Sequence, residues 1–220
     1  MSQALKYPPL EVKIWGGIAC FTRPEMKVER VSYDVMTPSA ARGVLEAIFW
    51  KPEFSWEVRE IWVLNPIRHF SILRNEVNSK AVISTARKWA KEGGGYFAEN
   101  DRAQRNALAL REVSYVIKAD VVLKRHASDD VAKYRDQFRR RVQRGQCHHI
   151  PYLGCREFSA YFAHPDGSEQ AIDITDDLGR MLFDLDYDSD GSGRGTPRFF
   201  SARLEAGILQ IPAELYQKGE

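Results

Sequence analysis

The stretch KYRDQFRRRVQRGQCHHIPYLGCREFSAYF, residues 133–162, decides how the rest of the chain is interpreted. It begins with the spacing of a short cationic helix and ends as an aromatic strand. From Lys133 to Arg156 it carries seven lysines and arginines against one acid, Asp136, whereas the whole chain has a formal charge of only +2. A basic block of this kind usually faces a polyanion such as nucleic acid. A solvated helical face is the plainer alternative, but the paired histidines and the Pro-Tyr-Leu-Gly turn that follow favour a binding surface.

Composition limits the class of protein. The chain has 220 residues, of which 44% are apolar and 11% aromatic, as expected for one large or two small globular domains. No apolar run approaches the ~18 residues of a membrane span, and residues 1–12 lack the pattern of a signal peptide. Three cysteines, an odd number, indicate no disulfide framework. We therefore expect a cytoplasmic protein without a membrane partner.

The N-terminal part alternates strands with one helix. Thr37 is a candidate N-cap, Pro38 lies in the first turn, and the helix must end before Pro52. The first strand contains Gly16 and Gly17, where we expect a break or bulge. The third strand is expected to shift its alternation in the middle. The expected strands cover residues 10–21, 28–35, 54–66, 67–78 and 108–123, and the helix covers residues 39–50.

The pattern weakens in the middle of the chain. Residues 81–91 fit either a helix ended by three glycines or part of a mobile insertion, and residues 79–105 are expected to be exposed, as in a lid over a bound partner. After the basic helix we expect a mostly antiparallel part. Its strands cover residues 156–163, 173–185 around a turn at 176–179, 198–204 and 207–212. We divide the chain after about residue 127, giving a mixed N-terminal domain 1–127 that starts as a split β-α-β unit, and a C-terminal domain 128–220.

Neither candidate metal site has the pattern of a known one. Asp184, Asp186, Asp188 and Asp190 precede a glycine, but the glutamate and flanking helices of an EF-hand are missing. Cys147 and Cys155 flank the two histidines without forming a CxxC pair. A solvated acidic turn is the simpler explanation of the aspartates, and the cysteine and histidine spacing is not a recognised zinc pattern, so we expect no metal and no cofactor.

The cationic stretch does contain the groups needed for RNA cleavage without a metal. That reaction requires a base for the 2′-hydroxyl, an acid for the leaving oxygen and cations for the phosphorane charge. Lys133, Tyr134, His148 and His149 could fill these roles. Each also has a simpler role: the tyrosine could only pack, the lysine only contact phosphate, and either histidine only hydrogen-bond within the fold.

The stretch F-R-R-R-x-x-x-G-Q-C-x-x-x-P-Y-L-G-C-R-E-F, residues 138–158, resembles the CRISPR-associated Cas-five proteins of the type I-C (Dvulg, or "d") subtype. Three N-terminal motifs agree: F-T-R-P-E at 21–25, S-Y-D-V-M-T-P-S-A-A-R-G at 32–43 and E-A-I-F-W-K-P at 46–52. I-W-V-L-N-P-I-R at 61–68 follows. The resemblance implies an α+β fold, with a ferredoxin-like (RRM-type) N-terminal domain and a small antiparallel β-sheet C-terminal domain.

The resemblance also implies a function. Members of this subtype cleave precursor CRISPR RNA at the repeat hairpin without a metal, by attack of the 2′-hydroxyl, which leaves a 2′,3′-cyclic phosphate. They then stay on the 5′ handle of the guide RNA as a subunit of the type I-C interference complex, an antiviral assembly that also contains backbone and large subunits. The implied partners are therefore the precursor RNA hairpin, the 5′ handle and those subunits.

Two of the family's catalytic positions differ in this chain. The resemblance implies a tyrosine in the first helix and a Lys-His pair before the basic helix. Here the first position is Phe49, and the pair is Lys133 and Tyr134. A phenol with an ordinary pKa near ~10 is a poor base unless cations stabilise its phenolate. Lys133 and Tyr134 are nevertheless the candidate catalytic residues, with His148 or His149 as replacements.

Six arginines are candidate RNA contacts. Four come from the basic helix and two from the matching N-terminal motifs: Arg139, Arg140, Arg141, Arg144, Arg42 and Arg23. Helical periodicity prevents all four helical arginines from facing one way. Three functions stay open: a guide-RNA endoribonuclease, a non-catalytic handle-binding subunit, and a basic module that also binds duplex DNA through its phosphates.

Overall fold

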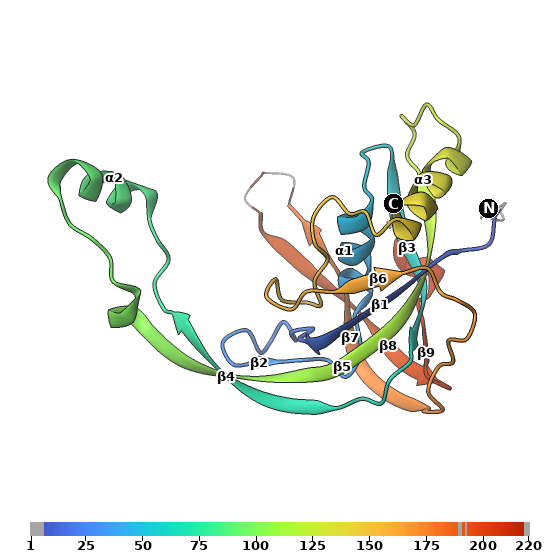
Figure 1. The fold of residues 1–220 in the computed structure, drawn as a ribbon, viewed down its shortest axis with the longest axis horizontal. Coiled ribbons are helices and arrows are strands. Elements are labelled where there is room, and N and C mark those ends of the chain that lie inside the picture. The colour runs from blue at the N-terminus through green and yellow to red at the C-terminus, as the bar shows by residue number, and fades with distance from the viewer. Residues whose placement is uncertain (1–6, 189–190, 192, 218–220) are drawn as a thin grey trace.

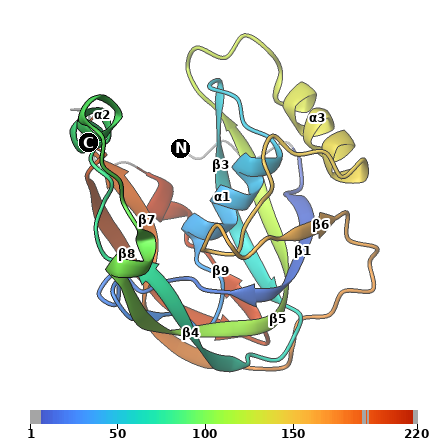
Figure 2. The same ribbon diagram turned by 60° about the vertical axis from the view of Figure 1, so that its left-hand side comes forward.

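The computed structural model describes residues 7–188, 191 and 193–217, which form a mixed α/β protein with one curled, mostly antiparallel sheet. Seven strands follow one another across the sheet in the order β6-β1-β5-β3-β9-β8-β7. Three α-helices accompany it, and α1 and α3 lie on the same side of the sheet (Figures 1 and 2). Among the described residues, no helix is long and apolar enough to cross a membrane.

Six elements build the part of the fold that carries α3. In chain order they are β1 (Leu10–Ala19), α1 (Pro38–Ile48), β3 (Phe54–Val63), β5 (Arg102–Leu123), α3 (Val131–Gln143) and β6 (Tyr161–Ala163). Their strands lie in the order β6-β1-β5-β3, and every adjacent pair is antiparallel. The boundary predicted at residue 127 falls between β5 and α3. However, β6, which lies beyond that boundary, pairs with β1.

An arm extends from this body (Figure 1). The first half of β5 pairs with β4 (His69–Val77), and the connection between them contains α2 (Ile83–Glu92) and the short 3-10 helix η1 (Ala98–Asp101). The side chains of β4 and α2 are exposed or half-buried throughout. The expectation of an exposed segment at residues 79–105 is confirmed, and the helical alternative is the right one for residues 83–92. The two-residue strand β2 (Arg30–Val31) pairs with β5 in parallel near the base of the arm.

The C-terminal strands extend the same sheet. The strands β7 (Asp176–Tyr187), β8 (Gly195–Glu205) and β9 (Ile208–Gln210) form an antiparallel series that joins β3 through β9, and the 3-10 helix η2 (Ala213–Tyr216) follows. Tyr216 ties this part to β3, because its hydroxyl donates to Val58 O at 3.0 Å and accepts from Val58 N at 2.8 Å. These bonds lie where the register of β3 shifts, as the sequence predicted.

The helix α1 forms as its sequence predicts. Thr37 caps it by accepting a hydrogen bond from Ala40 N, and Pro38 occupies the first turn. Its apolar residues recur at helical spacing, and Ala41, Val44, Leu45 and Ile48 are buried in the core. Phe49 ends the helix in an extended conformation, with φ of −153°. The Phe49 ring that follows the helix is buried in the core and is 1% exposed.

Three sequence-based expectations are wrong. The strand β1 runs through Gly16 and Gly17 without a change of register. Gly16 makes room for its neighbours, because a Cβ there would lie 2.6 Å from Cδ1 of the buried Leu153 and 3.0 Å from the backbone oxygen of Ser159. The turn expected at residues 176–179 is a bulge within β7, with Gly179 at φ +67°. Most of the strand expected at residues 156–163 is a tight turn, and only β6 at its end is a strand.

Candidate active site and nucleic-acid interface

The helix α3 is held by an apolar stripe on one face. Asp130 caps its N-terminus by accepting a hydrogen bond from Ala132 N at 2.7 Å. Tyr134, Phe138 and Val142 recur every four residues and are all buried. This stripe fixes which face of α3 meets the body, so it decides which of the basic residues face inward and which can meet a ligand.

An aromatic cluster joins α3 to β3 and to the end of α1. Phe54 is central: its ring centroid lies 5.4 Å from that of Phe49 and 5.3 Å from that of Tyr134. Trp56 packs on Phe138 at 4.8 Å and donates a hydrogen bond to Phe49 O at 2.9 Å. The Phe49 and Tyr134 rings therefore both pack on the Phe54 ring, and Lys133 directly precedes Tyr134 in the chain.

Lys133 is a solvent-accessible cation at the edge of this cluster. Its side chain is 61% exposed, and its Nζ lies 2.7 Å from Asp129 Oδ2. The hydrogen bond that Lys133 donates to Asp129 is the main cause that raises the pKa of Lys133. The group therefore stays an ammonium at neutral pH. Because an exposed ion pair contributes little stability, a phosphate can replace Asp129 as its partner.

Tyr134 lies in a different environment although it is the next residue. It is only 3% exposed, and its buried hydroxyl has no hydrogen-bond partner among the described residues. Burial is the main cause that raises its pKa, and Glu53 and Asp129 add to the effect, while Lys133 opposes it. The net effect keeps Tyr134 a neutral phenol. The expected stabilisation of a phenolate by Lys133 is present but is outweighed.

The two histidines lie beside the end of α1. The backbone N–H groups of His148 and His149 both donate to Ala47 O, at 2.8 and 3.4 Å. Both side chains are exposed, with their ring centroids 5.8 Å apart. The fold therefore holds two accessible imidazoles beside Ala47, which comes two residues before Phe49 in the chain.

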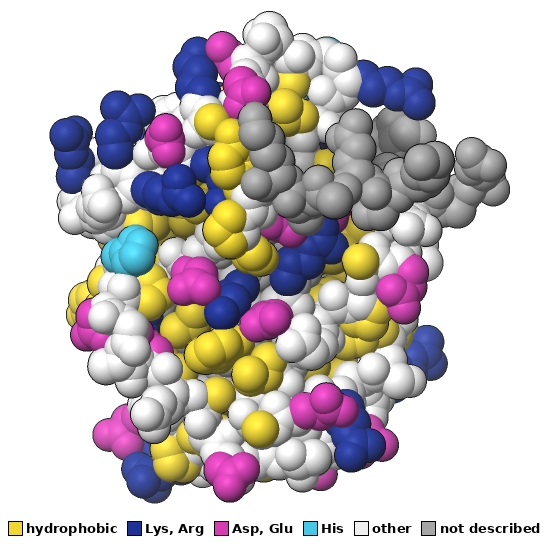
Figure 3. All heavy atoms as spheres, turned by 90° about the vertical axis from the view of Figure 1, so that its right-hand side faces the viewer, with side chains coloured by type: hydrophobic (Ala, Val, Ile, Leu, Met, Phe, Trp, Pro, Cys, Tyr) yellow, Lys and Arg dark blue, Asp and Glu magenta, His cyan; other side chains and the backbone are white. Residues whose placement is uncertain are grey.

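The arginines of α3 divide into two groups. Arg141 faces inward: its Nη1 donates to Ile48 O at 2.8 Å and its guanidinium lies over the Phe49 ring, so it caps the C-terminus of α1. Arg140 and Arg144 are exposed, and Arg139 forms a surface ion pair with Asp136 at 3.2 Å. Figure 3 views the molecule from the right-hand side of Figure 1. Lysine and arginine side chains gather at the upper left of this view, at the height of α3 in Figure 1.

Arg135 is a buried cation that the sequence analysis did not single out. It is 2% exposed, its Nη2 donates to Pro8 O at 2.5 Å, and its guanidinium stacks over the Tyr7 ring at 5.2 Å. Burial lowers its pKa, and Arg139 adds to the effect. The helical spacing of the apolar stripe places residue 135 next to Tyr134 and Phe138, and this signal could have identified it as inward-facing.

The two N-terminal arginines lie away from α3. Arg42, on α1, bridges Glu46 at 3.0 Å and Asp184 on β7 at 2.6 Å. Arg23 lies over the Tyr33 ring and 3.7 Å from an oxygen of Asp34. The structure does not bring these two arginines into one patch with the helical arginines.

A cleft of about 740 Å³ opens between α1, β3 and β7. Its walls include Arg42, Lys124 and Arg198, together with Trp50 and Tyr187. Phe54 also lines it, so the cleft reaches the aromatic cluster that holds Tyr134. Four acids line it too: Glu46, Glu57, Asp184 and Asp186.

No group of three or more potential metal ligands occurs among the described residues. In the acidic run, Asp184 pairs with Arg42, and Asp186 lies 3.6 Å from Arg198. Asp190 falls outside the described residues. Of the candidate thiols, Cys155 is buried and Cys147 is half-buried.

Comparisons with known proteins identify relatives over most of the chain. A family model described as "CRISPR-associated protein (Cas_Cas5)", of the Cas5d type, matches residues 9–212. A protein of Thermus thermophilus named "CRISPR pre-crRNA endoribonuclease Cas5d" is 51% identical, and the match covers 95% of this chain and 93% of the relative.

Two solved structures share the fold. One, described as "Crystal Structure of CRISPR-associated Protein", has a TM-score of 0.66 and 21% identity, and the match covers 96% of this chain and 95% of the other. A chain of a "CRISPR RNA-guided surveillance complex" has a TM-score of 0.51 and 11% identity over 94% of this chain and 92% of the other. These similarities concern the fold alone.

Proposed function

This chain belongs to the Cas5d family of CRISPR-associated proteins, and from that premise we propose that it is an endoribonuclease that cuts precursor CRISPR RNA at the repeat hairpin without a metal. The observation that carries the proposal is the position of Lys133. It is an accessible ammonium that matches the lysine of the family's catalytic pair, and it lies next to the aromatic cluster that contains the position of the family's tyrosine.

The proposed reaction is an internal transesterification. The 2′-hydroxyl oxygen attacks the adjacent phosphorus, the bond from phosphorus to the 5′-oxygen breaks, and the products are a 2′,3′-cyclic phosphate and a 5′-hydroxyl. One proton leaves the 2′-oxygen and one reaches the 5′-oxygen, so no co-reactant is consumed. Lys133 stabilises the negative charge that develops on the phosphoryl oxygens, after it exchanges Asp129 for the phosphate.

We propose that His148 or His149 transfers these protons. Imidazole is the side chain whose ordinary charge change lies between pH 5 and 8, and both rings are exposed beside the end of α1. Tyr134 is the alternative proton carrier. Its buried hydroxyl and raised pKa make it a donor rather than a base, and it would have to move to reach RNA. Phe49 cannot take part.

RNA binding is proposed to use the exposed side of α3. Arg140 and Arg144, with Arg139, contact phosphates of the hairpin, while Arg141 positions the end of α1 from within. Arg42 and Arg23 keep the proposed role of secondary phosphate contacts, but each must first leave a carboxylate partner.

After cleavage, the protein is proposed to remain on the 5′ handle of the guide, in the cytoplasm, as a subunit of the type I-C interference complex together with backbone and large subunits. The fold shared with a chain of a surveillance complex supports this setting. We also propose that β1, α1, β3, β5, α3 and β6 form the ferredoxin-like domain, since their strand order is β6-β1-β5-β3. In this division the domain extends past residue 127 to β6.

The test is incubation of purified protein with its own repeat hairpin in EDTA, comparing the wild type with Lys133→Ala, Tyr134→Phe and the pair His148→Gln, His149→Gln. We expect cleavage by the wild type, a large loss in Lys133→Ala and in the histidine pair, and no loss in Tyr134→Phe. If Tyr134→Phe lost cleavage activity and the histidine variants kept it, Tyr134 and not the histidines would be the proton carrier. Full activity of Lys133→Ala would refute the proposed site.

A non-catalytic handle-binding subunit is the second candidate, favoured by Phe49 at the family's tyrosine position. Tight hairpin binding by the wild type with no cleavage, with or without EDTA, would establish it. Duplex DNA binding is a third candidate, supported by the basic face of α3. It would weaken steeply with salt, whereas hairpin recognition by shape should persist.

A further inference from the structure

Two aromatic side chains stack on each other in the open, on the face of the sheet away from α3. Trp15 on β1 and Tyr161 on β6 are directly opposite in the antiparallel pairing. Their ring centroids lie 5.9 Å apart with planes 24° from parallel. Side chains alternate along a strand, and Ile14 next to Trp15 is buried in the core. Trp15 therefore points away from the core, and it is 36% exposed, while Tyr161 is 64% exposed.

Space is open beside this pair. Tyr161 lies on β6, which is the end strand of the sheet, so the outer edge of β6 has no neighbouring strand among the described residues. Gly17 follows Trp15 on the same face of β1, and a Cβ built there would meet no atom within 4 Å. The exposed Tyr161 ring and the open space beside Gly17 therefore leave room for a planar ring next to the aromatic pair.

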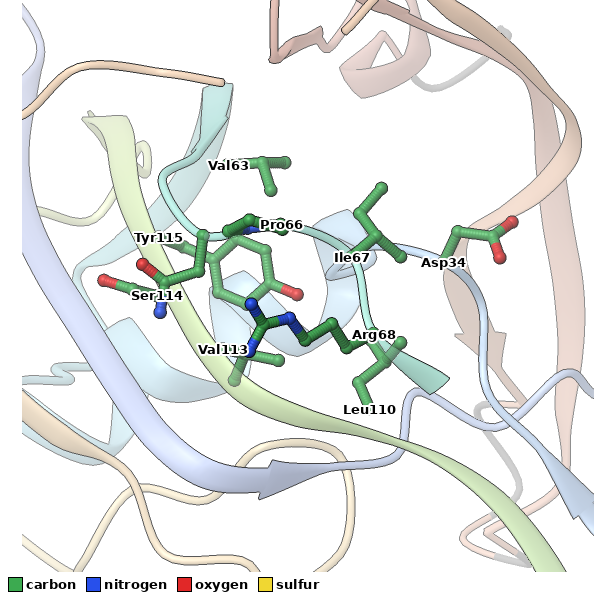
Figure 4. A pocket seen from close by; sticks show the side chains of 10 residues that line it. Asp34, Val63, Pro66, Ile67, Arg68, Leu110, Val113, Ser114 and Tyr115 are labelled. Carbon is green, nitrogen blue, oxygen red and sulfur yellow. The ribbon is translucent and has the colours of Figure 1, made fainter. Parts of the chain in front are cut away.

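Two cations flank the aromatic pair. Ser114 on β5 pairs with Trp15, and it lines a small cavity of about 10 Å³ together with Arg68. Figure 4 shows the Arg68 side chain reaching from the β3–β4 connection toward β5. Its Nη1 lies 3.1 Å from Glu112 Oε2, and these side chains are 52% and 67% exposed. On the other side of Trp15 along β1, Lys13 is held by Glu169 at 3.1 Å, and the Glu169 side chain is only 5% exposed, so this cation keeps its carboxylate partner.

We propose that Trp15 and Tyr161 form a stacking platform for unpaired nucleotides of RNA, with Arg68 contacting a flanking phosphate. Exposed aromatic side chains on a sheet next to cations are the combination that binds single strands, because every base has a face that can stack. Exposed ion pairs such as Arg68–Glu112 contribute little, so a phosphate can replace the carboxylate. The proposal rests on the proposed function, because a precursor RNA carries single strands next to its hairpin.

The test measures binding of a fluorescent oligo(A) of about eight nucleotides, within the site sizes of single-strand binding proteins, at fixed salt. We expect Trp15→Ala and Tyr161→Ala each to weaken binding by about 10-fold or more, and Trp15→Phe to stay close to the wild type. Phe97→Ala is the matched control, because Phe97 is an aromatic side chain that is 70% exposed but lies in the arm, directly before η1. An abasic oligomer of the same length should bind the wild type and Trp15→Ala equally.

Each outcome decides one hypothesis. Unchanged oligo(A) binding by the double variant Trp15→Ala, Tyr161→Ala would overturn the platform. The platform would also be overturned if the variants lost as much affinity for the abasic oligomer as for oligo(A), because the abasic oligomer has no base to stack. Cleavage of the repeat hairpin by the wild type is measured separately. If the wild type does not cleave but its oligo(A) binding depends on Trp15, the proposed reaction fails and the platform stands.

Discussion

The arginines on the two faces of α3 have different surroundings. On the inner face, Arg135 and Arg141 satisfy backbone carbonyls and stack on aromatic rings, beside the apolar stripe of Tyr134, Phe138 and Val142. On the outer face, Arg140 and Arg144 are exposed. A run of basic residues that looks uniform in the sequence therefore contains two populations. One fixes the helix to the body, and the other is free for a polyanion.

The largest effect should come from the inner face. Phe138→Ala removes a ring that is 1% exposed and packs on Trp56. We expect a loss of roughly 4 kcal/mol in the free energy of unfolding, measured by urea denaturation. Phe138→Leu, which keeps most of the volume, should lose clearly less. Similar stability of both variants and the wild type would mean that the stripe does not hold α3.

Lys133→Ala separates activity from stability. It should lower the cleavage rate by about 100-fold or more, the range for loss of one group that stabilises developing charge. The urea midpoint should stay unchanged, because the side chain is exposed and its ion pair with Asp129 lies at the surface. Arg125→Ala, an exposed cation outside α3, is the control for charge alone. A parallel fall in stability would place Lys133 in the group that fixes the helix.

The outer arginines should affect binding alone. The double variant Arg140→Ala, Arg144→Ala should weaken binding of repeat RNA roughly 10-fold at low salt. For each phosphate that the variant no longer binds, the slope of log K against log salt should also become shallower by about 1. Full affinity in the double variant would show that the outer face of α3 does not meet RNA.

Tyr134→Phe should have the smallest effect, and it should stabilise the protein rather than weaken it. The buried hydroxyl of Tyr134 has no partner among the described residues, and an unsatisfied buried polar group costs free energy. Removing it should raise the free energy of unfolding by about 1 kcal/mol, measured by urea denaturation. A loss of stability instead would reveal a hydrogen bond to this hydroxyl.

Local signals in the sequence predicted much of the fold. The cap and proline of α1, the alternation of β3 and its shift, and the basic helix α3 are all present. These features depend on neighbouring residues, so a short window contains their cause. The arrangement of the strands and the arm built from one half of β5 depend on distant pairings, which no window contains.

The candidate site was harder to predict for the same reason. Lys133 and Tyr134 are neighbours in the sequence, but one is exposed and the other buried, because only the second belongs to the apolar stripe. The approach of His148 and His149 to Ala47 follows from a long-range hydrogen bond. Gly16 looked like a break because glycine often marks one, whereas here it makes room for Leu153.

The strand β5 is shared by the arm and the core, which has a mechanical consequence. Residues 102–110 pair with β4, and residues 110–119 pair with β1 as one continuous strand. A slip of one residue would turn every side chain to the wrong face, so a pull on the arm cannot slide β5 through the sheet. Glu112, near the base of the arm, has a φ of +53°, so β5 departs from ideal strand geometry there while its register with β1 is kept on both sides. A force applied to the arm is therefore borne by the same strand that pairs with β1 and β3 in the core.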